Sequence, residues 1–272
     1  MAATHHNLPE HLVQQILETA PPLAEQIRLD PQNREFTEQG WEPVYSASPH
    51  ARIVVIGQAP GCAAQESRIP WNDPSGVKLR EWMGVTDEQF YDPELISLLP
   101  MDFYYPGKGA HGDNPPRKDF VPKWHPQLLE LMPDVQLILL VGAYSQKHYL
   151  DGVHAPKAQK NLTETVRAWE SYLPKFLPLV HPSPLNFRWQ AKNPWFEQEV
   201  VPALQKSRLS GCFSAVPFSA QRQDVFYFWL SASPRVTVMS WVEEPRLTFS
   251  FRLEPAAAAR TVPLSSSLLF TA

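Results

Sequence analysis

The most informative stretch of the chain is Ile53-Val54-Val55-Ile56-Gly57-Gln58-Ala59-Pro60-Gly61. Its first four residues are all apolar and β-branched, which predicts a strand buried on both faces, as in a parallel sheet. The glycines at the two ends of the following turn have no side chain, so the main chain there can approach a ligand closely. Residues 53–61 therefore predict a buried strand that ends in a turn of accessible backbone donors.

A second apolar run ends in a histidine further along the chain: Leu177-Pro178-Leu179-Val180-His181-Pro182-Ser183-Pro184-Leu185-Asn186. The prolines after the histidine predict a stiff loop, because proline restricts its own backbone and that of the preceding residue. In a parallel sheet flanked by helices, ligands bind outside the carboxyl ends of the strands. Two neighbouring strands that end in these two ways would bring the bare turn and the histidine together over one pocket.

Apolar runs alternate with helical patterns along most of the chain. Strands are expected at 53–56, 95–99, 135–141 and 176–180. Helices are expected at 74–83, 127–132, 143–149, 162–172 and 196–204, and a long loop rich in proline and glycine at 104–125. The alternation predicts an α/β fold of three α/β/α layers with a central, mainly parallel sheet of about four strands.

The chain divides into three segments by pattern and composition. Residues 1–44 are expected to form an N-terminal helical segment, interrupted by two adjacent prolines, that packs on the main domain. Residues 45–205 hold the α/β pattern and form the main domain. Residues 206–272 are a C-terminal extension without a chemical motif, in which alternating apolar residues at 236–242 and 247–253 predict a β-hairpin.

Composition narrows the class of protein. The net charge of the 272 residues is −4, which argues against a broadly basic nucleic-acid coat. A local basic patch can still bind DNA, because affinity depends on the phosphates that are contacted. No apolar run reaches the length of about 18 residues that a membrane span needs, so no membrane partner is expected. The two cysteines, Cys62 and Cys212, are too few for a disulfide framework, and we expect a cytoplasmic protein.

The two motifs together resemble those of the uracil-DNA glycosylase superfamily. Gly57-Gln58-Ala59-Pro60-Gly61 is similar to its first motif and His181-Pro182-Ser183-Pro184-Leu185-Asn186 to its last, and the resemblance covers residues 45 to 205. It implies a monomeric DNA glycosylase that flips a deaminated base, uracil above all, and hydrolyses its N-glycosidic bond. Several branches carry a four-cysteine iron–sulfur cluster, which two cysteines cannot supply, so no metal or cofactor is implied.

The resemblance also implies roles for residues of the pocket. His181 donates a hydrogen bond to the base oxygen on which charge accumulates, and Gly57, Gln58 and Ala59 contact the base. Trp71 lies where the superfamily places its base-stacking aromatic residue. In most members the first motif carries an acid that positions the hydrolytic water, and here Gln58 and Ala59 occupy the candidate positions.

Asp73 is a candidate to replace the missing acid. The segment Asp73-Pro74-Ser75-Gly76 resembles the Gly-Asp-x-Ser-Gly segment of a branch that lacks the acid in its first motif. The same aspartate precedes Pro74, a favoured first residue of a helix, so a helix N-cap also explains it. Catalysis and capping both remain open for Asp73 from the sequence.

The expected DNA contacts come from two loops. By resemblance, Ser183 contacts a phosphate, Leu185 is the wedge that fills the gap left by the extruded nucleotide, and Asn186 holds the loop. The loop at 104–125 carries a cluster of basic residues, of which Lys108, Arg117 and Lys118 are expected to contact phosphates. In the superfamily an asparagine after the second strand reads the base edge, and Asp102 of this chain is either such a reader or a structural residue.

Two other classes of function fit parts of the pattern. A nucleic-acid-binding member of the same fold without catalysis would keep Ser183, Leu185 and the basic loop but need no working acid. A hydrolase of free nucleosides would keep the pocket and need neither the wedge nor the phosphate contacts. Asp73 distinguishes the first alternative from a glycosylase, and Leu185 with the basic loop distinguishes the second.

Overall fold

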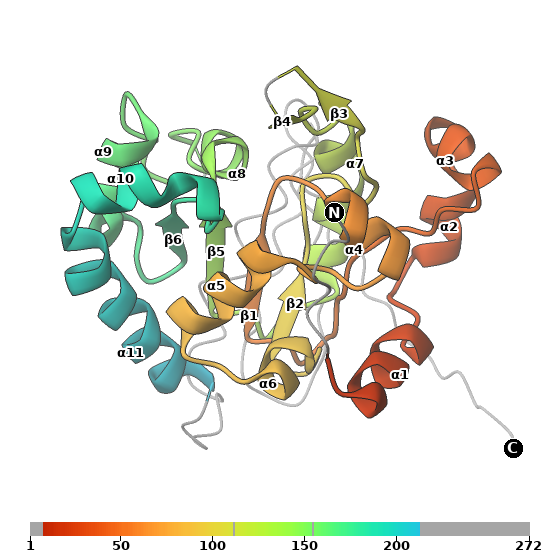
Figure 1. The fold of residues 1–272 in the computed structure, drawn as a ribbon, viewed down its shortest axis with the longest axis horizontal. Coiled ribbons are helices and arrows are strands. Elements are labelled where there is room, and N and C mark those ends of the chain that lie inside the picture. The colour runs from red at the N-terminus through yellow and green to blue at the C-terminus, as the bar shows by residue number, and fades with distance from the viewer. Residues whose placement is uncertain (1–7, 111, 154, 213–272) are drawn as a thin grey trace, which may run out of the picture. The chain divides into compact units, whose positions relative to one another are not determined.

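The computed structural model describes residues 8–110, 112–153 and 155–212 (Figure 1). By the density of its internal contacts the chain divides into two units, 1–217 and 218–272, and every described residue belongs to the first. The predicted hairpin at 236–253 lies outside the described residues. Within them, none of the helices combines the length and the apolar character required to traverse a lipid bilayer.

Four strands form one parallel sheet, as predicted: β1 (Ile53–Ile56), β2 (Ile96–Leu98), β5 (Leu137–Val141) and β6 (Phe176–Leu179). Their order across the sheet is β2-β1-β5-β6. The chain therefore leaves β1 toward one edge and later returns to the other side of it. Parallel strands place all their carboxyl ends at one edge of the sheet, where ligands bind in open α/β folds.

Both faces of the sheet are buried, and alternate residues of each strand point to opposite faces. Along β5, Leu137 and Leu139 belong to one apolar cluster, and Ile138 and Leu140 to the other. This explains why each strand reads as an uninterrupted apolar run rather than as an alternating one.

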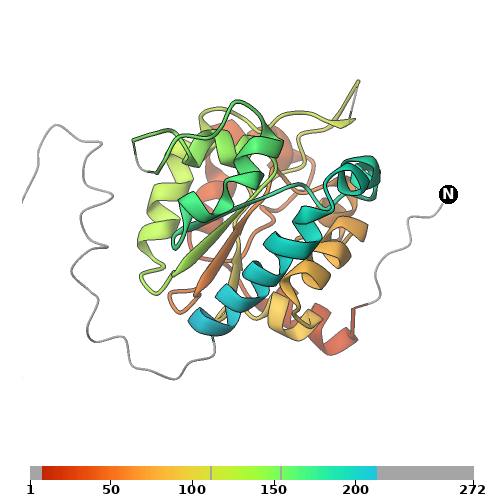
Figure 2. The same cartoon turned by 90° about the vertical axis from the view of Figure 1, so that its left-hand side faces the viewer.

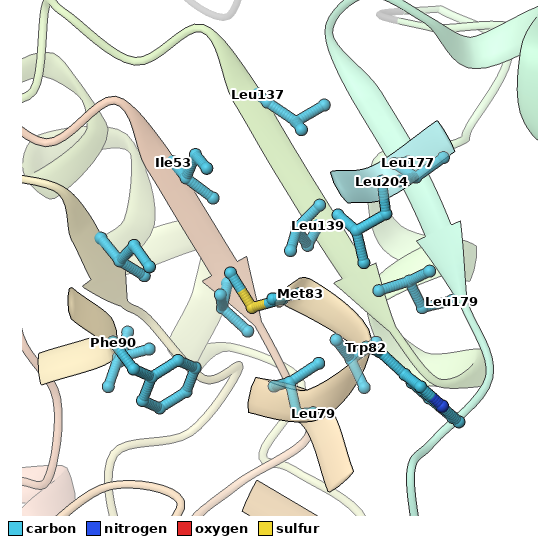
Figure 3. Packing of buried hydrophobic residues seen from close by; sticks show 14 of the residues in the cluster. Ile53, Leu79, Trp82, Met83, Phe90, Leu137, Leu139, Leu177, Leu179 and Leu204 are labelled. Carbon is cyan, nitrogen blue, oxygen red and sulfur yellow. The ribbon is translucent and has the colours of Figure 1, made fainter. Parts of the chain in front are cut away.

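Helices cover each face, which gives the three layers seen from the side in Figure 2. One face is covered by α5 (Pro74–Met83), α6 (Asp87–Tyr91) and α11 (Val201–Cys212). Trp82 and Met83 of α5 pack there with Leu204 of α11 against the strands (Figure 3). The other face is covered by α7 (Phe120–Glu130) and α8 (Ala143–Tyr149). The predicted three-layer α/β/α architecture is confirmed.

The N-terminal segment contributes to both faces. Its helices are α1 (Glu10–Glu18), α2 (Ala24–Leu29), the 3-10 turn η1 (Pro31–Asn33) and α3 (Arg34–Glu38). The interruption between the first two falls at Pro21-Pro22, where proline removes a backbone donor. Leu12 of α1 is buried in the cluster with α5, whereas Ile27 of α2 is buried in the cluster with α7.

The predicted loop at 104–125 is wrong in its second half. It begins with a short hairpin, β3 (Lys108–Gly109) and β4 (Gly112–Asp113), but α7 already starts at Phe120. The helix even contains Pro126. Phe120, Trp124 and Leu128 lie on one face of α7 and are buried, and this packing outweighs the helix-breaking effect of the proline.

The remaining elements are short and connect the layers. They are α4 (Cys62–Ser67), α9 (Leu162–Arg167), the 3-10 turns η2 (Trp169–Tyr172) and η3 (Pro184–Asn186), α10 (Phe187–Lys192) and the π-helical turn η4 (Phe196–Val200). The turn η4 leads directly into α11, so the segment boundary predicted after residue 205 falls inside that helix.

Candidate active site

The carboxyl ends of the strands surround a small pocket. The predicted turn follows β1 and the predicted histidine follows β6, but β5 lies between these two strands, so they are not the neighbours that the sequence suggested. The residue after β5 is Gly142, with a φ of 88°. A Cβ atom placed on Gly142 would lie 3.9 Å from the Cβ of His181. This distance is an ordinary van der Waals contact, so glycine is favoured at position 142 by its positive φ rather than by a lack of room.

All six residues predicted for catalysis and base binding line this one pocket. The lining residues are Val44, Gly57, Gln58, Ala59, Pro60, Gly61, Ala64, Pro70, Trp71, Asp73, Pro100 and His181. Asp73, Gln58 and His181 supply the polar side chains of the walls, and the other lining residues supply apolar side chains or bare backbone.

One ring nitrogen of His181 accepts a hydrogen bond, and the other has no hydrogen-bond partner among the described residues. The backbone N–H of Ser183 donates to its Nδ1 at 3.2 Å, and the Nδ2 amide of Asn186 donates to its carbonyl at 2.8 Å. Because Nδ1 accepts a hydrogen bond, a neutral ring carries its proton on Nε2. Burial lowers the pKa of His181, against the opposing charges of Asp73 and Asp113, which favours this neutral form.

Asp73 caps a helix with one carboxylate oxygen and lines the pocket at the same time. Its Oδ1 accepts from the backbone N–H of Gly76 at 2.7 Å, which caps the N-terminus of α5. Its Oδ2 accepts no hydrogen bond within the described part of the chain and lies 4.0 Å from the position a Cβ of Gly61 would take. One carboxylate oxygen therefore caps the helix while the other faces the turn of the first motif.

The indole ring of Trp71 lines the pocket and packs against Gly57 in the turn of the first motif. A Cβ on Gly57 would come within 2.8 Å of Cζ2 of the indole, so only glycine allows the ring this close. The ring also stacks on the imidazole of His181, with 5.9 Å between the ring centroids and an interplanar angle of 29°. The aromatic face predicted from the sequence thus lies beside the histidine.

Gln58 occupies a position of the missing acid and is engaged elsewhere. Its Nε2 amide donates to the carbonyl of Asn114 at 2.9 Å, just beyond strand β4. The Asn114 side chain in turn donates to the carbonyl of Pro106 at 3.1 Å. Gln58 therefore links the β3–β4 hairpin to the turn of the first motif. Its side chain is an amide, so it supplies no carboxylate to position a water molecule.

The loop after His181 projects apolar side chains into solvent. Leu185 is 86% exposed and Phe187 is 61% exposed. The Ser183 hydroxyl accepts from the backbone N–H of Leu185 at 3.2 Å, so it stabilises the turn that presents Leu185. Asn186 holds the same turn through the carbonyl of His181. An exposed leucine on a braced turn has the shape that a wedge between bases requires.

The basic residues of the loop at 104–125 separate into two kinds. Lys108 and Lys118 are exposed, as a phosphate contact requires. Arg117 instead donates through Nε and Nη2 to the two carboxylate oxygens of Asp102, each at 2.7 Å. Its Nη1 donates to Asn33 Oδ1 at 2.7 Å and to the carbonyl of Gln32 at 2.9 Å. The guanidinium of Arg117 therefore takes part in a structural ion pair, and its predicted phosphate contact stays a prediction.

Asp102 is the structural partner in this pair rather than a reader of the base edge. Its side chain is 1% exposed, and its carboxylate also accepts from the backbone N–H groups of Tyr104 and Arg117, each at 3.2 Å. Asp102 does not line the pocket. Of the segment after β2, Pro100 does so, and its carbonyl is bonded to Nε2 of the buried His125 at 2.9 Å.

Several residues of the site carried no signal in the sequence. Val44 and Ala64 form apolar walls of the pocket, and Asn114 anchors Gln58. Arg80 and Tyr91 contact the backbone beside Trp71. All five reach the site through tertiary packing from separate elements, and no local motif marks them.

The fold and the pocket define an open α/β protein that binds its ligand at the carboxyl edge of a parallel sheet. The family model of the uracil DNA glycosylase superfamily matches residues 44–205, more than half of the chain. The chain belongs to this superfamily, whose members are in general DNA glycosylases, hydrolases that act on N-glycosyl bonds.

Proposed function

We propose that this chain is a DNA glycosylase that flips a deaminated base, uracil, out of DNA and hydrolyses its N-glycosidic bond. The observation that carries the proposal is the state of His181. Its Nδ1 is satisfied by the Ser183 N–H, and burial lowers its pKa, so a neutral ring presents an Nε2–H donor. Such a donor needs no reorganisation when negative charge develops on a base oxygen.

Bond cleavage places its electron pair on the departing base. The C1′–N bond breaks, the base leaves as an anion, and the Nε2–H of His181 stabilises the charge on the adjacent base oxygen. Backbone N–H groups in the turn from Gly57 to Gly61 add further donors where the main chain is bare. A base inside a duplex cannot reach these groups, so it must first be extruded into the pocket.

The water that attacks the sugar is assigned to Asp73. Its Oδ2 faces the turn of the first motif, while Oδ1 is fixed by the cap of α5. The free oxygen orients the water by accepting a hydrogen bond from it. The water oxygen bonds to C1′, and its proton passes through the carboxylate to solvent. The base anion takes up a proton from solvent, so the products are the neutral free base and an abasic site.

DNA contacts are assigned to Trp71 in the pocket and to residues of two loops. Trp71 offers its aromatic face to the extruded base, and Leu185 fills the gap that the base leaves in the stack. Ser183, Lys108 and Lys118 contact phosphates. The exposed leucine on a turn braced by two hydrogen bonds supports this assignment and disfavours a hydrolase of free nucleosides, which has no use for a wedge.

The test is single-turnover excision from duplexes that carry uracil, hypoxanthine or xanthine, followed by alkaline cleavage of the abasic sites. His181→Ala should lower the rate by about a hundredfold or more, because a preorganised donor is lost, while DNA affinity stays within twofold. His50→Ala, at an exposed histidine outside the pocket, is the matched control and should leave the rate unchanged.

The same assay distinguishes the alternatives. A wild-type protein that binds the duplexes but releases no base would be a DNA-binding member of the superfamily without catalysis. Release of base from free nucleosides and none from DNA would identify a nucleoside hydrolase. Equal losses of affinity and rate in His181→Ala would give the histidine a role in binding alone.

A further inference from the structure

The segment that carries Trp71 has a backbone conformation that it would not adopt alone. Trp71 has a φ of 57°, in the left-handed region that residues with a side chain avoid. Its carbonyl is pressed against α5, since a Cβ on Gly76 would lie 1.8 Å from that oxygen. A conformation of this kind persists only where surrounding contacts impose it.

Two buried side chains bind the carbonyls on either side of this bend. The hydroxyl of Tyr91, in α6, donates to the carbonyl of Pro70 at 3.0 Å. Nη1 of Arg80, in α5, donates to the carbonyl of Trp71 at 3.5 Å and to the Tyr91 hydroxyl at 3.3 Å. The two side chains thus join two helices to consecutive carbonyls of the pocket wall.

Arg80 is an unusual residue for this place. Its side chain is 4% exposed, and its charge is balanced by Asp87, 2.6 Å from Nε. Its guanidinium also lies over the rings of Phe90 and Tyr91. Even so, Nη2 has no partner among the described residues, so the burial of the group is not fully compensated.

A buried ion pair of this kind is weak evidence for a role in stability, because apolar residues of similar volume often stabilise a core as well or better. What the arginine adds is a hydrogen-bond donor at a fixed position. An apolar side chain at position 80 could fill the volume but could not donate to the Trp71 carbonyl. The arginine therefore points to a requirement for the position of the tryptophan.

We propose that Arg80 and Tyr91 are positioning residues that hold Trp71 in the orientation needed to stack on the extruded base. The inference rests on the proposed function, because it assigns a purpose to the placement of the ring. Neither residue lines the pocket, and both act through the backbone of residues 70 and 71.

The experiment is a double-mutant cycle on the full-length chain. Tyr91→Phe removes one hydroxyl and Arg80→Lys removes the planar donor group, each in the wild-type and in the Trp71→Ala background. Tyr172→Phe is the control, since this buried tyrosine donates to the Lys157 carbonyl at 3.2 Å in the other apolar cluster. Single-turnover excision and urea denaturation are measured for every variant.

If the two residues act through Trp71, Tyr91→Phe lowers the excision rate about fivefold to tenfold in the wild-type background. The same change has less than a twofold effect where Trp71 is already alanine, although it destabilises both proteins equally. Tyr172→Phe leaves the rate unchanged. Equal losses of rate in both backgrounds would overturn the proposal and leave Arg80 and Tyr91 as general supports of the fold.

A second readout does not depend on excision. The indole N–H resonance of Trp71 is assigned as the signal missing in Trp71→Ala. It should shift in Tyr91→Phe and Arg80→Lys and stay in place in Tyr172→Phe. An inactive wild type with these shifts would refute the glycosylase function and keep the positioning role. An unmoved Trp71 resonance in both variants would refute the positioning role whatever the activity.

Discussion

Replacement of Arg117 by alanine tests whether this residue serves the fold or the DNA. The guanidinium makes two hydrogen bonds of 2.7 Å to Asp102, whose side chain is 1% exposed. Without it the carboxylate keeps only two backbone donors, of Tyr104 and of residue 117 itself, each at 3.2 Å. Breaking a buried pair by removing one partner costs about 3–5 kcal/mol, since an uncompensated charge remains.

Urea denaturation at neutral pH measures this cost. With an m value of about 3 kcal/mol/M, the midpoint of Arg117→Ala should fall by about 1–1.7 M. Adding Asp102→Ala should recover part of the loss, because no charge then remains buried without a partner. Lys118→Ala is the matched control at the exposed neighbouring cation. It should stay within about 0.5 kcal/mol of the wild type.

The salt dependence of binding to duplex DNA is a second measurement that distinguishes the role of Lys118 from that of Arg117. Lys118→Ala should reduce the slope of log K against log salt by about 1, because one phosphate contact is lost. Arg117→Ala, measured where it is folded, should keep the wild-type slope. A variant at Arg117 with unchanged stability and a slope reduced by about 1 would refute the structural role and restore the phosphate contact.

Three further predictions concern the pocket and its support. Asp73→Asn should lower the excision rate at least about tenfold, because asparagine does not orient the water as a carboxylate does. Its unfolding free energy should stay within about 0.5 kcal/mol of wild type, because asparagine still caps α5. An unaltered rate would leave Asp73 as a cap alone. Gly76→Ala should displace Trp71 and cost more than about 2 kcal/mol, because the new Cβ would lie 1.8 Å from a carbonyl oxygen; a wild-type melting curve and rate would contradict this. Burial lowers the pKa of His125 to about 3. Between pH 6.5 and about 3, the unfolded chain therefore binds a proton at this histidine that the native state does not bind. As the pH falls through this range, the free energy of unfolding should decrease by up to about 1.4 kcal/mol per pH unit because of this histidine. In urea titrations, the amount by which the unfolding free energy of wild type exceeds that of His125→Gln should therefore decrease between pH 6.5 and about 3.

Local sequence was sufficient for the elements that are buried on both faces or capped by their own residues. The run Ile53–Ile56 has no polar position that could face water, so a central parallel strand is its stable state. The helix Pro74–Met83 carries its start and stop in adjacent residues. Asp73 caps it and Gly84 ends it with a φ of 64°.

Long-range contacts decided what the same local patterns left open. The proline and glycine content predicted a loop up to residue 125, but α7 begins at Phe120 and runs through Pro126. Phe120, Trp124 and Leu128 gain more by packing on the sheet than one backbone hydrogen bond is worth. Arg117 had the appearance of a surface cation in a basic loop. Its partner Asp102 lies 15 residues earlier, and only the folded chain brings the two together.

The site shows the same division. Local sequence is enough to identify the available chemical groups, namely the bare turn from Gly57 to Gly61 and the histidine at 181, because glycine and proline restrict the backbone locally. Three features of the site follow from the folded chain alone. Strand β5 separates the strands of the two motifs, Asp73 caps α5 with one oxygen while the other faces the first motif, and Trp71 is held in a left-handed conformation. The reason is physical: strand order, hydrogen-bond partners and imposed backbone strain depend on groups far apart in the chain, which no local pattern records.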